Sequence, residues 1–266
     1  MTVASPSPIM RRVAKATVLP FGIWRRRGPG DLVILLYHRV GAGGREIDLP
    51  LDRFERQLGH LVEHAEAPTL DEWITDPRRG GVVLTFDDGY RDFHEHVVPL
   101  LVRYNVRALL YLATGLVEGE SMTPPSEEAV TWAQLAEAAS TGLVTVGAHT
   151  HHHADLSRAT ERQADEEMRR AKELIEDRLG TPCRHFAYPW AVGSTGADRA
   201  VRRLFSTAAL HAWRTNRRGR TDPHRLGRVP VLRNDGPLFF GAKARGMLDG
   251  EGLAYRVAGR GPWGRP

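Results

Sequence analysis

Two groups of polar residues in this sequence combine residue types and spacing that suit metal-assisted hydrolysis. The first is the adjacent pair Asp87 and Asp88, which follows the mainly apolar residues 82–86 and precedes Gly89. Two neighbouring carboxylates at the end of a buried strand cost free energy unless a cation or a shared proton stabilises them. Gly89 allows the tight turn that would let both carboxylates face one cavity. On its own, this pattern is more typical of a surface turn than of a site.

The second group is a run of histidines that follows another apolar segment. His149 and His153 are four positions apart, so one turn of helix would place both imidazole rings on the same side. Two imidazoles and one carboxylate form a common catalytic zinc set, which leaves coordination positions open for water. A solvated loop that binds metal adventitiously is the alternative interpretation. Because the run directly follows a predicted buried strand, we favour a metal site.

These residues need a scaffold that brings the ends of several strands together. Short apolar runs predict strands, and apolar residues at helical spacing predict the helices between them. The predicted strands cover residues 32–37, 82–86, 108–112, 143–148, 185–188 and 208–213. The predicted helices cover residues 51–64, 97–104, 161–179 and 197–205, and a further helix begins at 131. Such alternation indicates parallel strands in a barrel or a doubly wound sheet. In a parallel barrel, reactive groups gather at the carboxyl ends of the strands.

The composition is that of an ordinary globular protein whose 266 residues fit one α/β barrel. Cys183 is the only cysteine, which excludes an internal disulfide and weakly favours a reducing compartment. The net charge of +5 invites a nucleic-acid interpretation, but the positive charge concentrates near the two ends and in residues 214–220. The middle of the chain is close to balanced, and no nucleic-acid-binding signature occurs. We therefore expect no nucleic-acid partner.

Taken together, the motifs resemble those of the polysaccharide deacetylases (NodB-homology domain, carbohydrate esterase family four). The family pattern Thr-Phe-Asp-Asp-Gly is present at residues 85–89, and His-Thr-x-x-His at residues 149–153. The resemblance spans about residues 32–235. It implies a distorted (β/α) barrel with seven parallel strands, and an enzyme that uses one divalent metal, zinc with cobalt or nickel as alternatives.

The resemblance also implies roles for individual residues. Asp87 would be the general base of the reaction. Asp88, His149 and His153 would bind the metal ion. Thr150 would orient the metal site through hydrogen bonds rather than as a ligand.

The third motif departs from the commonest family form. Many members have Arg-Pro-Pro-Tyr-Gly where this sequence has Ala-Tyr-Pro-Trp-Ala at residues 187–191, which resembles the branch that includes biofilm poly-N-acetylglucosamine deacetylases. The base thus lacks its usual arginine partner. Arg228 is a candidate substitute, with a surface arginine as the alternative. Tyr188 and Trp190 are candidates for stacking on a sugar ring, and by resemblance a backbone N–H near Trp190 stabilises the oxyanion.

The position of the general acid also differs. The common family form has a histidine in a Leu-x-His motif near the C-terminus, but no histidine follows Leu226 here. The biofilm branch resembles a circular permutation, with this histidine directly after the first strand. His38 fits that place and is our predicted acid, with a structural histidine as the alternative. His151 and His152 fall on variable positions of the second motif and receive no role.

We expect three regions along the chain. Residues 1–30 are a basic arm around the mildly apolar segment 13–24, which is too short to span a bilayer and lacks the uninterrupted core of a signal peptide. The arm is either frayed or, through residues 11–27, in peripheral contact with an anionic membrane. Residues 31–236 form the deacetylase domain, and residues 237–266 a C-terminal helix and basic tail. A location in the cytoplasm or at the inner membrane is favoured over secretion.

The predicted function is removal of an N-acetyl (acyl) group from an amino-sugar-containing polysaccharide or glycoconjugate, so the expected partner is a carbohydrate. Two enzymatic alternatives use the same apparatus. One is an acetyl-ester deacetylase of the xylan type, and the other a membrane-associated deacetylase of a lipid-linked sugar. A carbohydrate-binding module without activity is disfavoured, because it would be expected to have lost Asp87 or a metal ligand.

Overall fold

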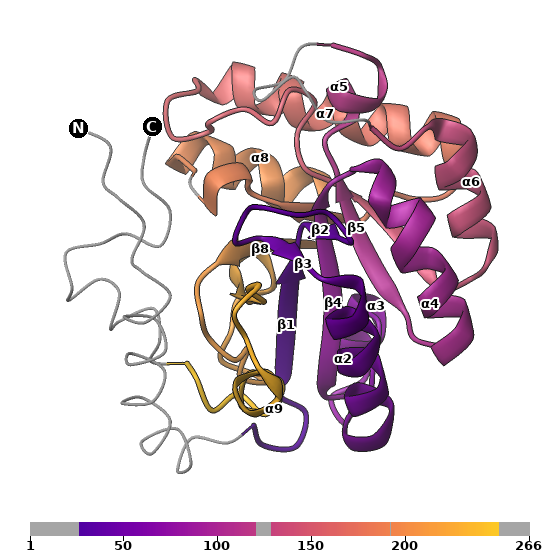
Figure 1. Cartoon of the computed structure of the whole chain (residues 1–266). Coiled ribbons are helices and arrows are strands. Elements are labelled where there is room, and N and C mark those ends of the chain that lie inside the picture. Colours follow the sequence, from indigo (N-terminus) through magenta and orange to yellow (C-terminus); the bar gives the residue numbers. More distant parts are fainter. Residues whose placement is uncertain (1–26, 121–128, 192, 250–266) are drawn as a thin grey trace, which may run out of the picture.

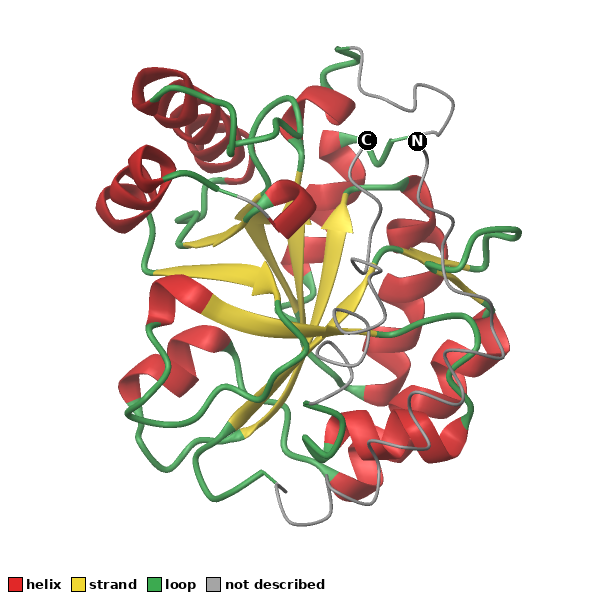
Figure 2. Cartoon of the chain, turned by 90° about the vertical axis from the view of Figure 1, so that its left-hand side faces the viewer, coloured by secondary structure: helices red, strands yellow, loops and turns green. Residues whose placement is uncertain are grey.

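In the computed structural model, which describes residues 27–120, 129–191 and 193–249, seven parallel strands close into a barrel. Its strands are β1 (Leu32–Tyr37), β4 (Gly81–Asp88), β5 (Ala108–Leu112), β6 (Val144–Ala148), β7 (His185–Ala187), β8 (Thr207–His211) and β9 (Leu226–Pro230), in that order around the barrel. The helices lie around the strands (Figures 1 and 2). The predicted barrel of seven parallel strands is confirmed.

The helices complete the alternating pattern that the sequence predicts. They are α2 (Leu51–His64), α3 (Leu70–Thr75), α4 (Val98–Tyr104), α5 (Thr114–Val117), α6 (Trp132–Ser140), α7 (Glu161–Leu179), α8 (Thr195–Leu204) and α9 (Pro237–Ala244). A π-helical segment precedes α4, and the two-residue strands β2 (Arg39–Val40) and β3 (Asp48–Leu49) pair with each other. The bounds of β1, β5, α2 and α7 agree with those predicted, whereas α3, α5, β2, β3 and β9 were not predicted.

The barrel has separate cores on its two sides because successive residues of a strand point to opposite faces. In β1, Leu32 and Ile34 belong to the cluster inside the barrel, while Val33 and Leu35 pack outside among the helices. At the amino end of the strands, Trp73 of α3 joins the interior cluster and donates a hydrogen bond to the carbonyl of Gly30 at 2.8 Å. That end is therefore filled with apolar side chains, and polar groups are left for the carboxyl end.

Two predicted regions lie largely or partly outside the described residues. The basic arm is described only from residue 27 onward, so its predicted contact with a membrane stays a prediction. The C-terminal region contains α9 as expected, and its basic tail is not described. Within residues 27–120, 129–191 and 193–249, no helix is both long enough and apolar enough to cross a membrane.

Candidate active site

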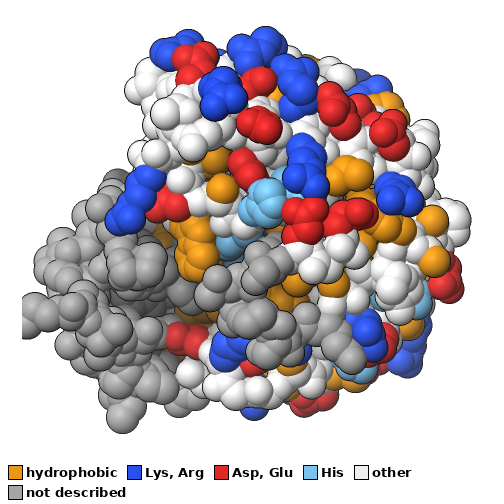
Figure 3. All heavy atoms as spheres, turned by 90° about the horizontal axis from the view of Figure 1, so that it is seen from above, with side chains coloured by type: hydrophobic (Ala, Val, Ile, Leu, Met, Phe, Trp, Pro, Cys, Tyr) orange, Lys and Arg blue, Asp and Glu red, His pale blue; other side chains and the backbone are white. Residues whose placement is uncertain are grey.

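The residues of the three motifs meet at the carboxyl end of the barrel. Asp87 and Asp88 end β4, His38 follows β1, and His149 follows β6. Figure 3, which views the molecule from this end, shows histidine side chains in a hollow with acidic and basic side chains around it. Parallel strands bring their carboxyl ends to one rim, and so residues far apart in the sequence share one site.

Asp88, His149 and His153, which we call the inner cluster, converge as metal ligands would. Each offers one donor atom, and these atoms lie within 4.8 Å of one another. Asp88 Oδ1 is 3.7 Å from His149 Nε2 and 3.4 Å from His153 Nε2. This oxygen is buried and has no hydrogen-bond partner among the described residues. A buried carboxylate oxygen without a donor is costly, and a cation between these three groups would satisfy it.

The orientation of His149 supports this interpretation. Its Nδ1 lies 2.8 Å from the carbonyl oxygen of Ala187, so Nδ1–H donates there. Nε2 then carries the lone pair and faces Asp88, which is the tautomer that metal binding requires. Burial lowers the pKa of His149 to about 4, against the opposing charge of Asp87. The ring is therefore neutral at neutral pH and fit to be a ligand.

The reason for the spacing of the two histidines requires a correction. They do not share a helical turn, because residues 149–153 form a loop. Thr150 and His153 have φ angles of 61° and 54°, in the left-handed region that residues other than glycine rarely adopt. The Thr150 hydroxyl accepts a hydrogen bond from the N–H of Ala154 at 3.0 Å. Thr150 thus stabilises the loop that carries the ligands and does not contact the ligand atoms in any hydrogen bond the structure shows.

Arg228 pairs with the predicted base. Its two terminal nitrogens donate to Asp87 Oδ1 and Oδ2 at 2.5 and 2.8 Å. Arg228 lies on β9 opposite Ile34 of β1 and His211 of β8, and is 1% exposed. The alternative of a surface arginine is therefore wrong. Burial alone would raise the pKa of Asp87, but the charges of Arg228 and His149 and the hydrogen bonds from Arg228 outweigh it and hold that pKa well below its usual range.

His38 lies beside the same carboxylate. It follows β1 directly, and its charge contributes to the lowered pKa of Asp87. The segment after it is held in place by Asp92, which accepts a hydrogen bond from the N–H of Val40 at 2.5 Å and lies 3.6 Å from the Arg39 guanidinium. Two independent contacts to one carboxylate therefore fix where this segment leaves the barrel rim.

The motif analysis missed His211. It ends β8 opposite Arg228, and its ring packs against Trp213 at 4.0 Å between centroids. Burial, followed by the charges of Arg228 and His38, lowers the pKa of His211 well below its usual range. His211 is thus a neutral neighbour of the predicted acid. Its position near the end of the predicted strand 208–213 was the signal that would have found it.

The third motif also needs a correction. Tyr188 is 2% exposed, packs edge-to-face on Phe186, and donates its hydroxyl proton to Asp198 at 2.6 Å. It belongs to the core between barrel and helices and is not available for stacking on a sugar. Trp190, by contrast, is 52% exposed, and its ring lies edge-to-face with that of His153 at 4.8 Å. Of the two aromatic residues, only Trp190 is exposed enough to stack on a sugar ring.

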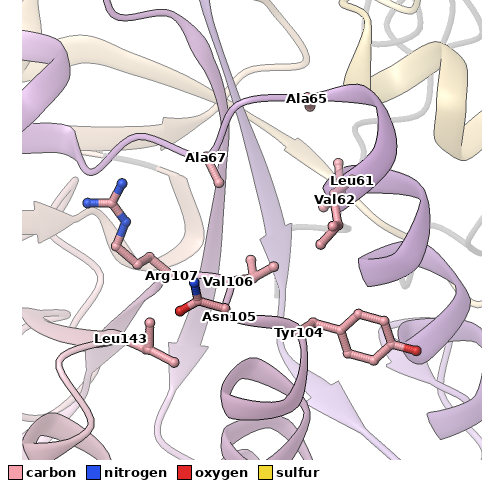
Figure 4. A pocket seen from close by; sticks show the side chains of 9 residues that line it. All are labelled: Leu61, Val62, Ala65, Ala67, Tyr104, Asn105, Val106, Arg107 and Leu143. Carbon is pink, nitrogen blue, oxygen red and sulfur yellow. The ribbon is translucent and has the colours of Figure 1, made fainter.

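A cavity of about 470 Å³ lies elsewhere and is separate from this site (Figure 4). Val106, Arg107 and Leu143 line it, and these residues precede β5 and β6. It therefore opens near the amino ends of the strands, away from the motif residues. In parallel barrels the reactive groups lie at the carboxyl ends of the strands. We therefore assign the chemistry to the rim and not to this cavity.

Comparison with known proteins agrees with the fold and the site. Residues 75–209 match the family model for polysaccharide deacetylases, and the chain belongs to that family. Among curated relatives, YxkH of Bacillus subtilis (strain 168) is 27% identical over 168 residues, covering 60% of this chain and 57% of YxkH. The poly-beta-1,6-N-acetyl-D-glucosamine N-deacetylase of Escherichia coli (strain K12) is 28% identical over 150 residues, covering 48% of this chain and 21% of that protein. The chain thus spans well under two thirds of these relatives.

Solved structures match over more of the chain. IcaB from Ammonifex degensii is 27% identical, with a TM-score of 0.70 over 84% of this chain and 98% of IcaB. The Streptococcus pyogenes deacetylase PplD, solved in complex with acetate, is 22% identical, with a TM-score of 0.72 over 82% of this chain and 99% of PplD. The second likeness shows the shared fold alone.

Proposed function

We propose that this chain hydrolyses the N-acetyl group of an amino sugar within a polysaccharide or glycoconjugate. The observation that carries the proposal is the buried Asp87–Arg228 pair beside the inner cluster, in a chain of the polysaccharide deacetylase family. The pair supplies an ionised, oriented base, and the cluster supplies convergent ligands. Together they form the two parts that amide hydrolysis by an activated water requires.

The inner cluster fits one divalent metal, which we propose to be zinc because two imidazoles and a carboxylate suit it. When bound, such an ion supplies Lewis acidity toward the acyl oxygen and toward a water molecule. The protein's own part is to hold the ligands in the required state. The Ala187 carbonyl fixes the tautomer of His149, and the loop that contains Thr150 brings His153 to the same point.

Asp87 takes the proton of the attacking water in the proposed reaction. Arg228 keeps both carboxylate oxygens ionised and fixed in direction until the proton arrives. His38, which follows β1 between β4 and β9 in the barrel, donates a proton to the departing sugar nitrogen. An amine leaves poorly as an anion, and so protonation at this atom is essential for an amide and less so for an ester.

Two features support an amino-sugar substrate. Two of the similar proteins are named as N-deacetylases of poly-beta-1,6-N-acetyl-D-glucosamine, those of Escherichia coli (strain K12) and Staphylococcus aureus (strain MRSA252). The exposed ring of Trp190 beside His153 offers an apolar face on which a sugar ring can stack next to the acyl group. The substrate therefore approaches along the rim, with its acetyl group directed to the inner cluster.

The test is release of acetate from β-1,6-linked N-acetylglucosamine oligomers and from acetylated xylo-oligomers, with the untreated protein and after chelation. We expect release from the amide substrate, its loss with chelator, and its return when zinc is restored. Release from the xylo-oligomers alone would replace the proposal by an ester deacetylase. No release from either substrate class would overturn both assignments.

A further inference from the structure

A second group of ligand-type side chains lies beside the inner cluster and takes no part in the proposed chemistry. Glu120, His151 and His152, which we call the outer cluster, each place one donor atom within 4.8 Å of the others. Glu120 Oε2 is 3.0 Å from His151 Nε2 and 2.8 Å from His152 Nε2. We propose that the outer cluster is a second divalent-metal site, suited to zinc or a metal of similar chemistry.

The ring of His152 is oriented as in a metal ligand. Its Nδ1 donates to Glu167 Oε1 at 2.6 Å, and the other oxygen of Glu167 accepts hydrogen bonds from the N–H groups of His151 and His152 at 3.1 and 2.8 Å. A carboxylate that holds one ring nitrogen leaves the other to face the ion, which is the usual outer arrangement of metal-bound histidines. Here the other nitrogen, Nε2, faces Glu120.

His151 is held from behind in the same way. Its side chain is fully buried, and its Nδ1 lies 2.7 Å from the hydroxyl oxygen of Thr114. Its carbonyl accepts a hydrogen bond from the N–H of Gly115 at 2.8 Å. A Cβ atom at Gly115 would lie only 2.7 Å from that oxygen, and so this close approach needs glycine. The packing leaves Nε2 as the ring nitrogen that points at Glu120.

The charges explain why a cation fits between these groups. When each Nδ1 keeps its proton, both Nε2 atoms of the neutral rings carry lone pairs, and both face a carboxylate oxygen. Lone pairs at 2.8 to 3.0 Å repel each other unless a proton or a metal ion lies between them, and a metal ion can take this place when both rings are neutral. Arg170 donates to the second oxygen of Glu120 at 2.6 Å, which leaves Oε2 directed at the histidines.

The donor set and its exposure indicate which ions can enter. Two imidazoles and one carboxylate form a borderline set that prefers zinc and similar ions over calcium or magnesium. Donor atoms around a tetrahedral zinc ion are roughly 3.4 Å apart, so the separations of 3.0 and 2.8 Å would widen by roughly half an ångström when the ion binds. The His152 side chain is 42% exposed, so a fourth position is open to water and the ion loads directly from solution.

An ion in the outer cluster would connect three segments. Glu120 follows α5, the histidines lie in the loop of residues 149–153, and Glu167 and Arg170 belong to α7. That loop also carries His149 and His153, and its left-handed residues store backbone strain. The outer ion therefore acts as a structural clamp on the loop that positions the inner ligands.

The test counts metal ions in the full-length chain without an affinity tag. The protein is stripped with chelator, equilibrated with zinc, and measured by elemental analysis. We expect two equivalents in the unaltered protein and one in a His149→Ala, His153→Ala variant. Adding Glu120→Gln and His152→Ala to that variant should remove the remaining ion, with an increase in Kd of at least about 100-fold. A His94→Ala variant is the matched control, since His94 pairs with Glu137 at 3.0 Å and belongs to neither cluster.

Three results would overturn the proposal. One is a single equivalent in the unaltered protein, which is what hydrogen bonds between protonated histidines and Glu120 predict. Another is no zinc in the His149→Ala, His153→Ala variant when circular dichroism shows that it is folded. If that variant does not fold, the double variant Glu120→Gln, His152→Ala, which keeps the inner cluster, provides the test. Two equivalents of zinc remaining in this double variant would exclude the outer site. None of these counts depends on deacetylase activity, so the proposed function stands or fails separately.

Discussion

The inner and outer clusters have the same ligand types but different surroundings. Each combines two histidines and one carboxylate, and one loop of five residues supplies all four histidines. In the inner cluster Asp88 is 8% exposed and His149 is 2% exposed. In the outer cluster the side chains of Glu120 and His152 are 36% and 42% exposed. The first and last histidines of the loop, His149 and His153, thus belong to the inner cluster, and the middle pair, His151 and His152, belongs to the outer cluster.

What distinguishes the clusters chemically is the neighbour of each carboxylate. Beside the inner cluster lies a second carboxylate, Asp87, kept ionised by Arg228 and adjacent to His38. Beside the outer cluster lies Arg170, which occupies the free oxygen of Glu120, and Glu167, which already accepts three hydrogen bonds. A ligand set alone therefore does not make a catalytic centre. A base with capacity for a proton must adjoin it.

The largest expected effect follows from removing that base. Asp87→Asn deletes the proton acceptor and leaves the ligands of both clusters in place, so turnover should fall by about 10³- to 10⁴-fold. Zinc content should stay at the level of the unaltered protein. Acetate release and elemental analysis on the same preparation measure both. A near-normal rate in Asp87→Asn would remove the distinction between the clusters, whatever the metal content.

The parts of the site that local patterns encode were predictable. Continuous apolar runs define β1 and β5, and the Thr160 capping box together with Gly180 in the left-handed conformation delimits α7. Asp87, Asp88, His149 and His153 occupy short motifs next to such elements, and so their convergence at one rim followed from the barrel alone.

The parts that depend on distant contacts were not predictable. β9 contains a charged residue, a glycine and a proline, which reads as a loop. It is a strand because Arg228 points into the barrel and pairs there with Asp87, which lies 141 positions earlier in the sequence. The outer cluster was not predicted for a similar reason, since Glu120 lies 31 positions before His151 and outside every motif.

The second effect in size concerns the general acid. His38→Ala should lower turnover of an N-acetyl substrate by about 10²- to 10³-fold and remove the alkaline limb of the pH–rate profile. An activated aryl acetate, whose leaving group needs little protonation, should be affected far less. His224→Ala is the control, because His224 contacts the carbonyl of Phe205 and lies outside the rim. Equal losses on both substrates would show that His38 is structural, like the histidines of the outer cluster.

A smaller effect is expected from the partner of the base. Arg228→Gln removes the charge that contributes to the lowered pKa of Asp87. The acidic limb of the pH–rate profile reports protonation of this carboxylate, so it should move to higher pH, with turnover reduced about 10- to 100-fold. Arg228→Lys keeps the charge but loses the two-point contact, and its limb should move less. An unchanged acidic limb in Arg228→Gln would mean that another group titrates there.

The smallest effect tests burial itself, in protein stripped of metal. The pKa of His149 is about 4 in the folded chain, below its ordinary value of 6.5, because burial opposes the charged ring. As pH falls below 6.5, His149 therefore binds a proton in the unfolded chain but not in the folded chain. The free energy of unfolding decreases until about pH 4. At pH 5 the loss attributable to His149 is about 2 kcal/mol relative to pH 7.5.

His152 of the outer cluster should respond with the opposite sign. Burial would lower the pKa of His152, but the hydrogen bonds to Glu167 and Glu120 outweigh it and raise that pKa above 6.5. Its contribution to stability is therefore present below pH 6.5 and is lost as pH rises through the folded-state pKa.

Urea unfolding at pH 5 and pH 7.5 in the presence of chelator separates the contribution of His149 to stability from that of His152. His149→Asn should flatten the loss of stability on acidification, and His152→Gln should steepen it. If both variants changed the pH dependence in the same direction, burial would not be what separates His149 from His152, and the difference between these two histidines would have to come from their neighbouring charges alone.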